Sequence, residues 1–446
     1  MDWLSPNRRW ARWLAGRGVP AERILEVTRW ADEWRGGGGP DEAMRRRLLA
    51  VEAASGRSVR NVLLMDPLLR RRPEGDALRY LAVCARRIDE YLADRRIEAV
   101  FGEQTWAFEL LVGQLCRARG IPHLLPHTVR VPDGRFAFFD PYRELAPVRV
   151  REVHEADRRA ARETLATFRE HRPRPAYMAV DRAVLRLDPR RLHLLWRHVA
   201  DLAGDPWDET SRRPLALIAD HTRQALRARA HRRLAPYERS LPVDRPFVLF
   251  PLHMQPEATI DVKGQPYTDQ AELVRAMVRT LPLDHELWVK EHPSALARRP
   301  RSLYRELLAI PGVRLLAPEL PTFDLIERAA LVVTVTGTAA YEAALLGRPA
   351  ATIAPIFFEE VVRFPRFDPF AQSLREMLAA AAERRPGQQE PEDFLTRLFA
   401  DSFPGLVGDA LWQPQSLQED NLERVADGFL RLLAGLCDRR PTAEAD

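Results

Sequence analysis

Short apolar runs alternate with longer amphipathic segments through the second half of this chain. The apolar runs are rich in Val, Leu and Phe, as in buried strands, and the segments between them repeat apolar residues at helical spacing. This pattern predicts strands at 247–252, 286–292, 313–318, 331–336 and 350–354, and helices at 270–281, 301–310, 322–328 and 338–346. Strands that alternate with helices predict a parallel, Rossmann-like sheet.

A weaker alternation occupies the first half. It predicts strands at 61–66, 97–103 and 121–127, and helices at 77–92 and 107–119. Residues 151–240 are rich in Arg and expected to be mainly helical, which indicates an insertion or a long connection. Further helices are expected at 371–384, 391–402 and 419–436. We therefore predict an α/β protein with two Rossmann-like domains, at 61–240 and 241–368, a helical extension at 1–60, and C-terminal helices at 369–446 that pack back across the domains.

Tryptophan and arginine are concentrated near the N-terminus. Trp10, Trp13 and Leu14 form an apolar stripe at helical spacing, next to Arg9 and Arg12. Such a stripe usually packs on the adjacent domain as a small helical cap. The alternative is an interfacial helix, in which Trp lies among lipid headgroups and Arg meets phosphate, so peripheral contact with the inner membrane is a second interpretation.

The composition restricts the class of protein. The 446 residues include 68 basic and 63 acidic ones, a net charge of +5, interleaved along the chain, so we expect no nucleic-acid partner. The three cysteines, Cys84, Cys116 and Cys437, are far apart, which argues against a disulfide framework or a zinc site. No apolar run reaches the ~18 residues of a membrane span, and the N-terminus lacks a secretory signal. We therefore expect a cytoplasmic protein.

The predicted strand at 286–292 ends in polar residues. Pro293 holds His292 in an extended conformation, so a helix cannot begin there and the imidazole lies in a loop at the strand end. In an α/β sheet, ligands bind outside the carboxyl ends of the strands. We therefore expect His292 to donate to a phosphate oxygen, with Lys290 adding positive charge.

The strand at 331–336 ends in Thr336, Gly337 and Thr338. Glycine permits close approach of a ligand, and Thr338 is a plausible N-cap of a helix whose free N–H groups would face a phosphate. Glu342 lies one helical turn further on, among small alanines. We expect its carboxylate to accept hydrogen bonds from ribose hydroxyls.

The loop after the strand at 247–252 is also polar. It contains His253, Gln255 and Glu257. The loop is too polar for a core and too apolar for a routine surface loop, so we expect it to contact the base, the sugar or the phosphate of a nucleotide-sugar donor.

The first half contributes fewer candidates. Glu103 follows Gly102 at a strand end, where it can act as a general base or, equally, complement the dipole of the next helix. His127 ends the third predicted strand and Arg130 follows it, and we expect them to bind an anionic acceptor group.

Several motifs are absent from the sequence. We find no D-x-D metal clamp, Walker A motif, H-E-x-x-H, G-x-S-x-G or G-x-G-x-x-G. We therefore expect a metal-independent mechanism without a cofactor, based on backbone N–H groups, His and Arg.

Three segments resemble a known family. PLHMQPEATID, WVKEHP and VVTVTGTAAYEAALLGRPA are similar to the bacterial capsular polysaccharide biosynthesis and export proteins, relatives of the Kdo transferases and of sialyl- and polysialyltransferases. The resemblance covers about residues 246–356 and is looser over 97–140. It implies a GT-B architecture, with two Rossmann-like domains facing a cleft and the donor bound mainly by the second.

The resemblance also implies roles for individual residues. His292 and Pro293 match the HP motif that contacts the donor phosphate, often of a CMP-sugar, and Thr336 and Thr338 match the small-hydroxyl turn. Glu342 matches the ribose-binding Glu of UDP-N-acetylglucosamine 2-epimerases. The acidic base motif of the sialyltransferases is not matched, which leaves the catalytic base open.

The expected function is therefore a metal-independent glycosyltransferase that moves a sugar from a nucleotide-sugar, with a CMP-sugar such as CMP-Kdo favoured over a UDP-sugar. The acceptor would be a capsular polysaccharide or a glycolipid. The alternatives are a nucleotide-sugar 2-epimerase, a CDP-polyol phosphotransferase, and a non-catalytic factor of capsule assembly or export.

Overall fold

A computed structural model shows an α/β protein, so the predicted class is confirmed. The chain forms two compact units, each discontinuous in sequence. Unit 1 comprises Met1–His123, Ala183–Arg233 and Pro256–Asp261, and unit 2 comprises Leu124–Arg182, Leu234–Gln255 and Val262–Asp446. The structure describes residues 1–140, 145–173, 196, 199–200, 204–211, 213–234, 237–241, 245–292, 295, 299–383, 391–408 and 413–438.

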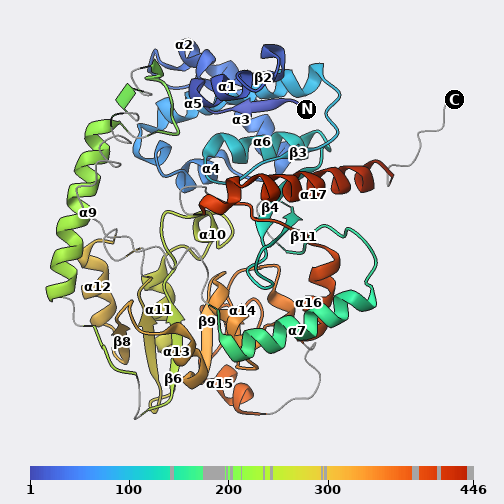
Figure 1. Cartoon of the computed structure of the whole chain (residues 1–446). Coiled ribbons are helices and arrows are strands. Elements are labelled where there is room, and N and C mark those ends of the chain that lie inside the picture. The colour runs from blue at the N-terminus through green and yellow to red at the C-terminus, as the bar shows by residue number, and fades with distance from the viewer. Residues whose placement is uncertain are drawn as a thin grey trace. The chain divides into compact units, whose positions relative to one another are not determined.

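A five-stranded parallel sheet is the centre of unit 2 (Figure 1). Its strand order is β10-β9-β6-β7-β8. The strands are β6 (Phe247–Pro251), β7 (Glu286–Lys290), β8 (Val313–Leu316), β9 (Leu331–Thr334) and β10 (Ala350–Thr352). Most of their residues are buried, which explains why they read as continuous apolar runs rather than as alternating ones. All five strands were predicted from the sequence.

Helices connect these strands as the sequence predicts. They are α11 (Gln270–Arg279), α12 (Arg301–Leu308), α13 (Thr322–Arg328) and α14 (Thr338–Leu345). The chain moves outward from β6 to β8, then returns past β6 to β9 and β10. Because such crossovers are right-handed, this reversal places α11 and α12 on one face of the sheet and α13 and α14 on the other. The contacts agree, since α11 packs on α12 and α13 on α14.

Unit 2 also contains antiparallel strands. Strand β5 (Arg135–Phe139) pairs with β4 (His123–Thr128) on one side and with β11 (Phe403–Pro404) on the other. The sequence did not predict β5, which begins directly after the turn at Asp133 and Gly134. Gly134, at φ 71°, lets the chain fold back after β4, so this part is a hairpin and not a continuation of a parallel Rossmann pattern.

Unit 2 contains further α-helices. They are α7 (Glu155–His171), α15 (Leu374–Ala382), α16 (Pro391–Ala400) and α17 (Glu419–Asp438). Helices α7 and α16 lie side by side (Figure 1). Phe136, Phe138, Phe403 and Phe429 form an aromatic cluster in which the rings of Phe138 and Phe429 meet edge to face at 4.8 Å. Gly428 is required here, because a Cβ would lie 2.7 Å from Cζ of Phe136.

Unit 1 is mainly helical. Its helices are α1 (Arg8–Ala15), α2 (Ala31–Trp34), α3 (Glu42–Ser55), α4 (Val59–Met65), α5 (Glu74–Asp94), α6 (Ala107–Ala118), α9 (Pro214–Leu234) and α10 (Ala258–Asp261). Short 3-10 turns occur at Ala21–Arg23, Val27–Trp30 and Leu69–Arg71. Helices α3, α5 and α6 pack on one another and form its core. Its strands are β1 (Trp3–Ser5), β2 (Ile24–Glu26) and β3 (Val100–Phe101).

Two predictions for unit 1 were wrong. A strand was predicted at 61–66, but residues 61–65 belong to α4, which begins after its N-cap Ser58, buries Val62, Leu63 and Met65, and ends at the C-cap Asp66. An apolar run this short fits either type of element, and the cap decides. The extension at 1–60 is not purely helical, because β1 and β2 pair in parallel. None of the described helices is long and apolar enough to cross a lipid bilayer.

Candidate functional site

The loops after β6, β7 and β9 meet at the carboxyl edge of the parallel sheet of unit 2. Strand β6 continues into His253, β7 into Glu291 and His292, and β9 into Thr336. The strand order reverses at β6, so the loops after β6 and β9 flank the switch point of the sheet. Ligands of open α/β sheets bind at this position.

His253 joins two of these loops. Its Nε2 accepts a hydrogen bond from the backbone N–H of Thr336, at 3.4 Å. Gly337 lies so close that a Cβ at this position would be 3.3 Å from Cε1 of His253. The imidazole therefore packs directly beneath the turn that begins α14, and glycine is needed at 337 for this close approach.

The backbone of His253 is held from the opposite side by Gln270, the first residue of α11. Gln270 Oε1 accepts from His253 N at 2.7 Å, and Gln270 Nε2 donates to His253 O at 3.1 Å. The same amide nitrogen donates to Gln255 Oε1 at 2.7 Å, and Gln255 Nε2 in turn donates to Thr268 O at 3.1 Å. The predicted donor-pocket residues His253 and Gln255 are therefore fixed by one buried amide.

A buried ion pair links this loop to the one after β7. Arg299 Nε lies 3.1 Å from the carboxylate of Glu291, and another nitrogen of the guanidinium donates to His253 O. Glu291 also accepts from Tyr304 Oη and, at 2.6 Å, from the backbone N–H of His292. Its side chain is fully buried. The network Glu291–Arg299–His253–Thr336 thus ties together all three strand ends.

The surroundings of His253 keep its imidazole neutral. Its pKa is lowered to about 3, mainly by burial and to a lesser extent by repulsion from the nearby His292 and Arg299. A neutral imidazole is required for Nε2 to accept the Thr336 N–H, so the electrostatics and the hydrogen bond agree. His253 is therefore poised to hold the turn, not to carry charge at neutral pH.

The residues predicted around the HP motif have different surroundings. His292 is half-buried beside Glu291, and it contributes to the lowered pKa of His253. Lys290 is buried, and its Nζ donates to Pro318 O at 3.1 Å, beyond the end of β8. Pro293 lies outside the described residues.

The turn before α14 differs in one detail from the prediction. Gly337, not Thr338, is the N-cap, and Thr338 is the first helical residue, with no side-chain capping bond at this end. Thr334 Oγ1 instead donates to Gly337 O at 3.2 Å and closes the turn. Thr336 is buried, while Gly337 and Thr338 are partly exposed at the helix N-terminus.

Glu342 is buried in an ion pair with Arg130. Arg130 Nη2 and Nε lie 2.9 and 3.2 Å from Glu342 Oε1, and both side chains are less than a tenth exposed. Burial raises the pKa of Glu342, while Arg130 opposes this shift. The two residues were predicted for opposite substrates, ribose and acceptor, and the structure brings them together within unit 2.

Arg130 also lines a hollow of about 320 Å³. Its walls are the turn at 130–133, one face of α7 including Glu163 and Thr167, and Pro173. Arg130 Nη2 donates to Pro173 O at 3.0 Å, and its backbone has a φ of 49°, a left-handed conformation that side chains other than glycine rarely adopt. The hollow has the size of a small-ligand pocket.

Two predicted site residues lie elsewhere. His127, on β4, packs edge-on against Phe139 at 6.5 Å. Glu257 belongs to unit 1, where its backbone N–H donates to Asp261 Oδ2 at 3.0 Å at the start of α10.

In unit 1, the loop between β3 and α6 contains the predicted base Glu103. Glu103 is exposed, and its Oε2 accepts from Thr105 Oγ1 at 3.5 Å. Glu109, which the sequence analysis missed, accepts from the backbone N–H groups of Thr105 and Trp106 at 2.8 and 3.0 Å. Its pKa is raised to about 7, mainly by burial and also by the nearby Glu103, while the two backbone hydrogen bonds oppose the shift. A carboxyl that titrates near neutrality suits general acid–base chemistry, so this loop offers two candidates.

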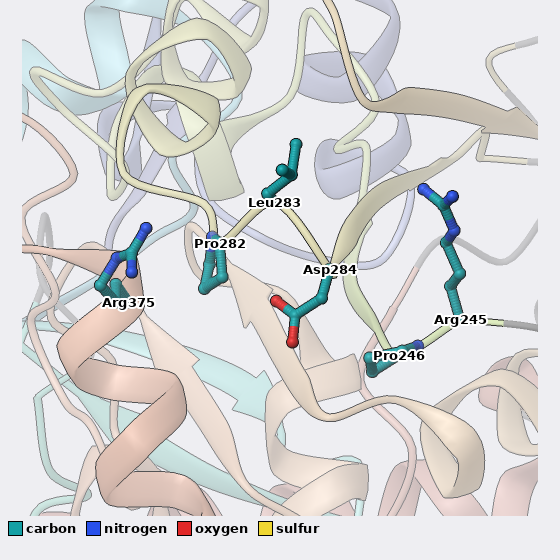
Figure 2. A pocket seen from close by; sticks show the side chains of 6 residues that line it. All are labelled: Arg245, Pro246, Pro282, Leu283, Asp284 and Arg375. Atoms are coloured by element: carbon teal, nitrogen blue, oxygen red, sulfur yellow. The ribbon is translucent and has the colours of Figure 1, made fainter.

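A second hollow of unit 2, of about 780 Å³, lies at the opposite edge of the sheet. It is formed by residues that precede β6 and β7 and by Arg375 of α15. Figure 2 shows Asp284 between Arg375 and Arg245 in that view. Because ligands of such sheets bind at the carboxyl ends of the strands, we do not assign the donor to this hollow.

The buried partners Gln270, Glu291, Arg299, Tyr304 and Glu109 were not predicted. The sequence contained a signal for Glu291, because a Glu directly after an apolar strand is expected to have a buried partner. Arg299 and Tyr304 gave none, because their role depends on a chain path that sequence spacing does not define.

Comparison with known proteins agrees with the sequence resemblance. Residues 209–359 match the family described as "Capsule polysaccharide biosynthesis protein". Comparison with curated proteins finds no significant match.

Comparison with solved structures matches, among others, a beta Kdo 2,7 transferase, KpsC of Thermosulfurimonas dismutans, with 13% identity over 68% of this chain and 79% of that one, at a TM-score of 0.32. The beta Kdo 2,4 transferase of the same KpsC has 15% identity over 69% and 81%, also at 0.32. A UDP-GlcNAc 2-epimerase of Methanocaldococcus jannaschii has 12% identity over 72% and 80%, at 0.28. The segment that matches the family, residues 209–359, includes β6, β7, β9 and the loops that follow them.

Proposed function

We propose that this chain is a glycosyltransferase of surface or capsular polysaccharide synthesis that uses a nucleotide-sugar donor. The observation that carries the proposal is the link from His253 to Thr336 at the switch point of the sheet. It lies within the segment that matches the capsule family, and at the place where a parallel sheet binds a phosphate-bearing ligand. Units 1 and 2 would then be the acceptor and donor domains of a GT-B-type enzyme.

The donor phosphate is assigned to the N-terminus of α14 and to His292. Helix α14 begins at the turn that His253 supports, and its first N–H groups can bind phosphate oxygens. His292 adds a hydrogen-bond donor from the neighbouring strand end. No residue of this set requires a metal, and metal-independent transfer is part of the proposal.

In the transfer itself, the bond between the anomeric carbon and the donor phosphate breaks, and the leaving phosphate oxygen keeps the electron pair. The helix N-terminus and His292 stabilise that negative charge. The acceptor hydroxyl forms the new bond to the anomeric carbon and gives its proton to a base. Glu103 and Glu109 are the two candidates for this base.

Arg130 is assigned to an anionic group of the acceptor or of a sugar acid. Its guanidinium is at the edge of the 320 Å³ hollow, and Glu342 holds it there. Glu342 can hold a ribose only if Arg130 moves away, so the arrangement favours Arg130 as the contact residue and Glu342 as its support.

A thermal-shift screen with CMP, CDP, UDP and GDP tests donor binding, because a ligand at 100-fold its Kd stabilises the folded state by about 2.7 kcal/mol. A CMP-sugar such as CMP-Kdo is the favoured donor. Donors that stabilise the chain are then incubated with saccharide or glycolipid acceptors, with and without EDTA. Transfer that persists in EDTA supports the proposal. Release of an altered free sugar without acceptor would indicate an epimerase, and nucleotide binding without turnover a non-catalytic assembly factor.

A further inference from the structure

Helix α1 presents tryptophan and arginine to solvent on one face. Trp10 and Trp13 are 44% and 46% exposed, and their rings meet edge to face at 5.7 Å. The guanidinium of Arg17 lies 3.5 Å from the ring centre of Trp13, and that of Arg9 lies 5.7 Å from that of Trp10. We call Arg9, Trp10, Arg12, Trp13 and Arg17 the Trp–Arg face.

The inward face of α1 is buried and capped by residues other than these tryptophans. Ala11 and Leu14 are buried, and Asn7 caps the helix by accepting from Trp10 N at 3.1 Å. Asn7 Nδ2 also donates to Asp208 Oδ2 at 3.0 Å, within unit 1. The helix is therefore anchored by other residues, and the exposed indoles are not needed for its packing in the core of unit 1.

The charge of the Trp–Arg face is uniformly positive. No Asp or Glu occurs between residues 3 and 21. Arg8 is kept separate from the face, because its Nε lies 3.7 Å from the buried Glu26. Arg9, Arg12 and Arg17 are all exposed, so three positive charges surround two adjacent indoles.

This combination matches the boundary of an anionic bilayer. Tryptophan partitions to the headgroup region, where its ring is partly dehydrated and its N–H stays hydrogen-bonded, and arginine binds lipid phosphate. A single-stranded nucleic acid would need rings on which bases can stack, but here the faces of both indoles are approached by arginine and the rings meet edge to face.

We infer that the Trp–Arg face of α1 binds the surface of a bilayer that contains anionic phospholipid. The interaction is peripheral: the indoles enter the headgroup layer and the arginines pair with lipid phosphates. It places unit 1 at a membrane independently of which reaction the chain catalyses.

The test uses the full chain and sedimentation with vesicles of phosphatidylcholine, with or without phosphatidylglycerol. Binding to the anionic vesicles is expected to fall about fivefold for each arginine removed in Arg9→Gln/Arg12→Gln, and about tenfold or more in Trp10→Ala/Trp13→Ala. The control is Arg46→Gln/Leu49→Ala, which removes an exposed charge and an exposed apolar side chain from α3 and should bind like the parent.

The parent should also lose binding as salt increases, and its tryptophan emission should be quenched by brominated lipid. Melting temperatures show whether each variant folds. If the tryptophan variant does not fold, the arginine variant alone tests the inference. Absence of binding to anionic vesicles, equal binding to the neutral ones, or unchanged binding in both α1 variants would overturn it. So would an RNA oligonucleotide that binds through the same residues while vesicles do not.

Discussion

Arg130 Nη2 lies 2.9 Å from Glu342 Oε1, in a pair that is almost completely buried within unit 2. The pair joins the turn after β4 to the middle of α14, the helix whose N-terminus is assigned to the donor phosphate. Tyr341 Oη strengthens the same junction by donating to Val131 O at 2.8 Å. The position of α14 and the conformation of the Arg130 turn are therefore set together.

Removal of one partner of this pair should destabilise the chain strongly. Arg130→Met leaves the buried Glu342 carboxylate without compensation, at a cost of about 3–5 kcal/mol in the free energy of unfolding. Arg130→Met/Glu342→Gln should recover part of that loss. Urea unfolding measures both, and Glu152→Gln, at an exposed pair with Arg149, should change stability by less than about 1 kcal/mol.

The double variant also separates the two roles of Glu342. If Glu342 only supports Arg130, the double variant keeps its nucleotide affinity and loses acceptor binding. If nucleotide affinity falls while acceptor binding persists, Glu342 holds the ribose and the assignment of Arg130 is wrong.

His253 should be replaceable by a side chain that accepts the same hydrogen bond. His253→Gln can present Oε1 to Thr336 N, whereas His253→Ala leaves that buried N–H unsatisfied, at a cost of about 1–3 kcal/mol. We expect His253→Ala to weaken nucleotide binding much more than His253→Gln does. Equal loss in both variants would show that the imidazole itself contacts the donor.

The pH dependence of stability gives a second measurement on His253. Its folded-state pKa of about 3 is below the usual value near 6.5, so between these values the unfolded state binds more protons. Stability should therefore fall as the pH drops below about 6.5, by about 2 kcal/mol at pH 5 from this residue. His123, whose pKa burial lowers to about 4, acts in the same direction. The difference between parent and His253→Gln isolates the contribution of His253.

Glu109 should show the opposite dependence. Its folded-state pKa of about 7 is above the usual value of 4.5, so stability is lost as the pH rises through this window. Glu109→Gln, whose amide oxygen can still accept from Thr105 and Trp106, should match the parent near pH 4 and exceed it by about 1–3 kcal/mol at pH 8. Glu103→Gln, at an exposed position, is the matched control. If one of these two variants still folds but no longer catalyses transfer, the residue that it replaces is the base.

The sequence predicted the parallel sheet well because each of its strands is an apolar run followed by a polar turn. It placed His253, His292 and Thr336 at strand ends, and the structure shows that these strands are neighbours and that His253 is hydrogen-bonded to Thr336. It could not predict that Arg130 meets Glu342, since 212 positions separate them and only the β4–β5 hairpin brings them together. The strand prediction at 61–66 failed for a local reason. The apolar run alone does not distinguish a helix from a strand, and the cap at Ser58 makes it a helix.

The close approach of Gly337 to His253 gives the last prediction. In Gly337→Ala, the new Cβ would lie 3.3 Å from Cε1 of His253 and from Cβ of Thr334, so either the imidazole or the turn has to shift. We expect a loss of about 1–3 kcal/mol in stability and a larger proportional loss in nucleotide affinity, because the shift moves the N–H groups assigned to the phosphate. Gly435→Ala is the matched control: its Cβ meets nothing within 4 Å, and in helix α17 it should stabilise the chain by up to about 1 kcal/mol. Retention of full nucleotide affinity by Gly337→Ala, despite lower stability, would place the phosphate away from this turn.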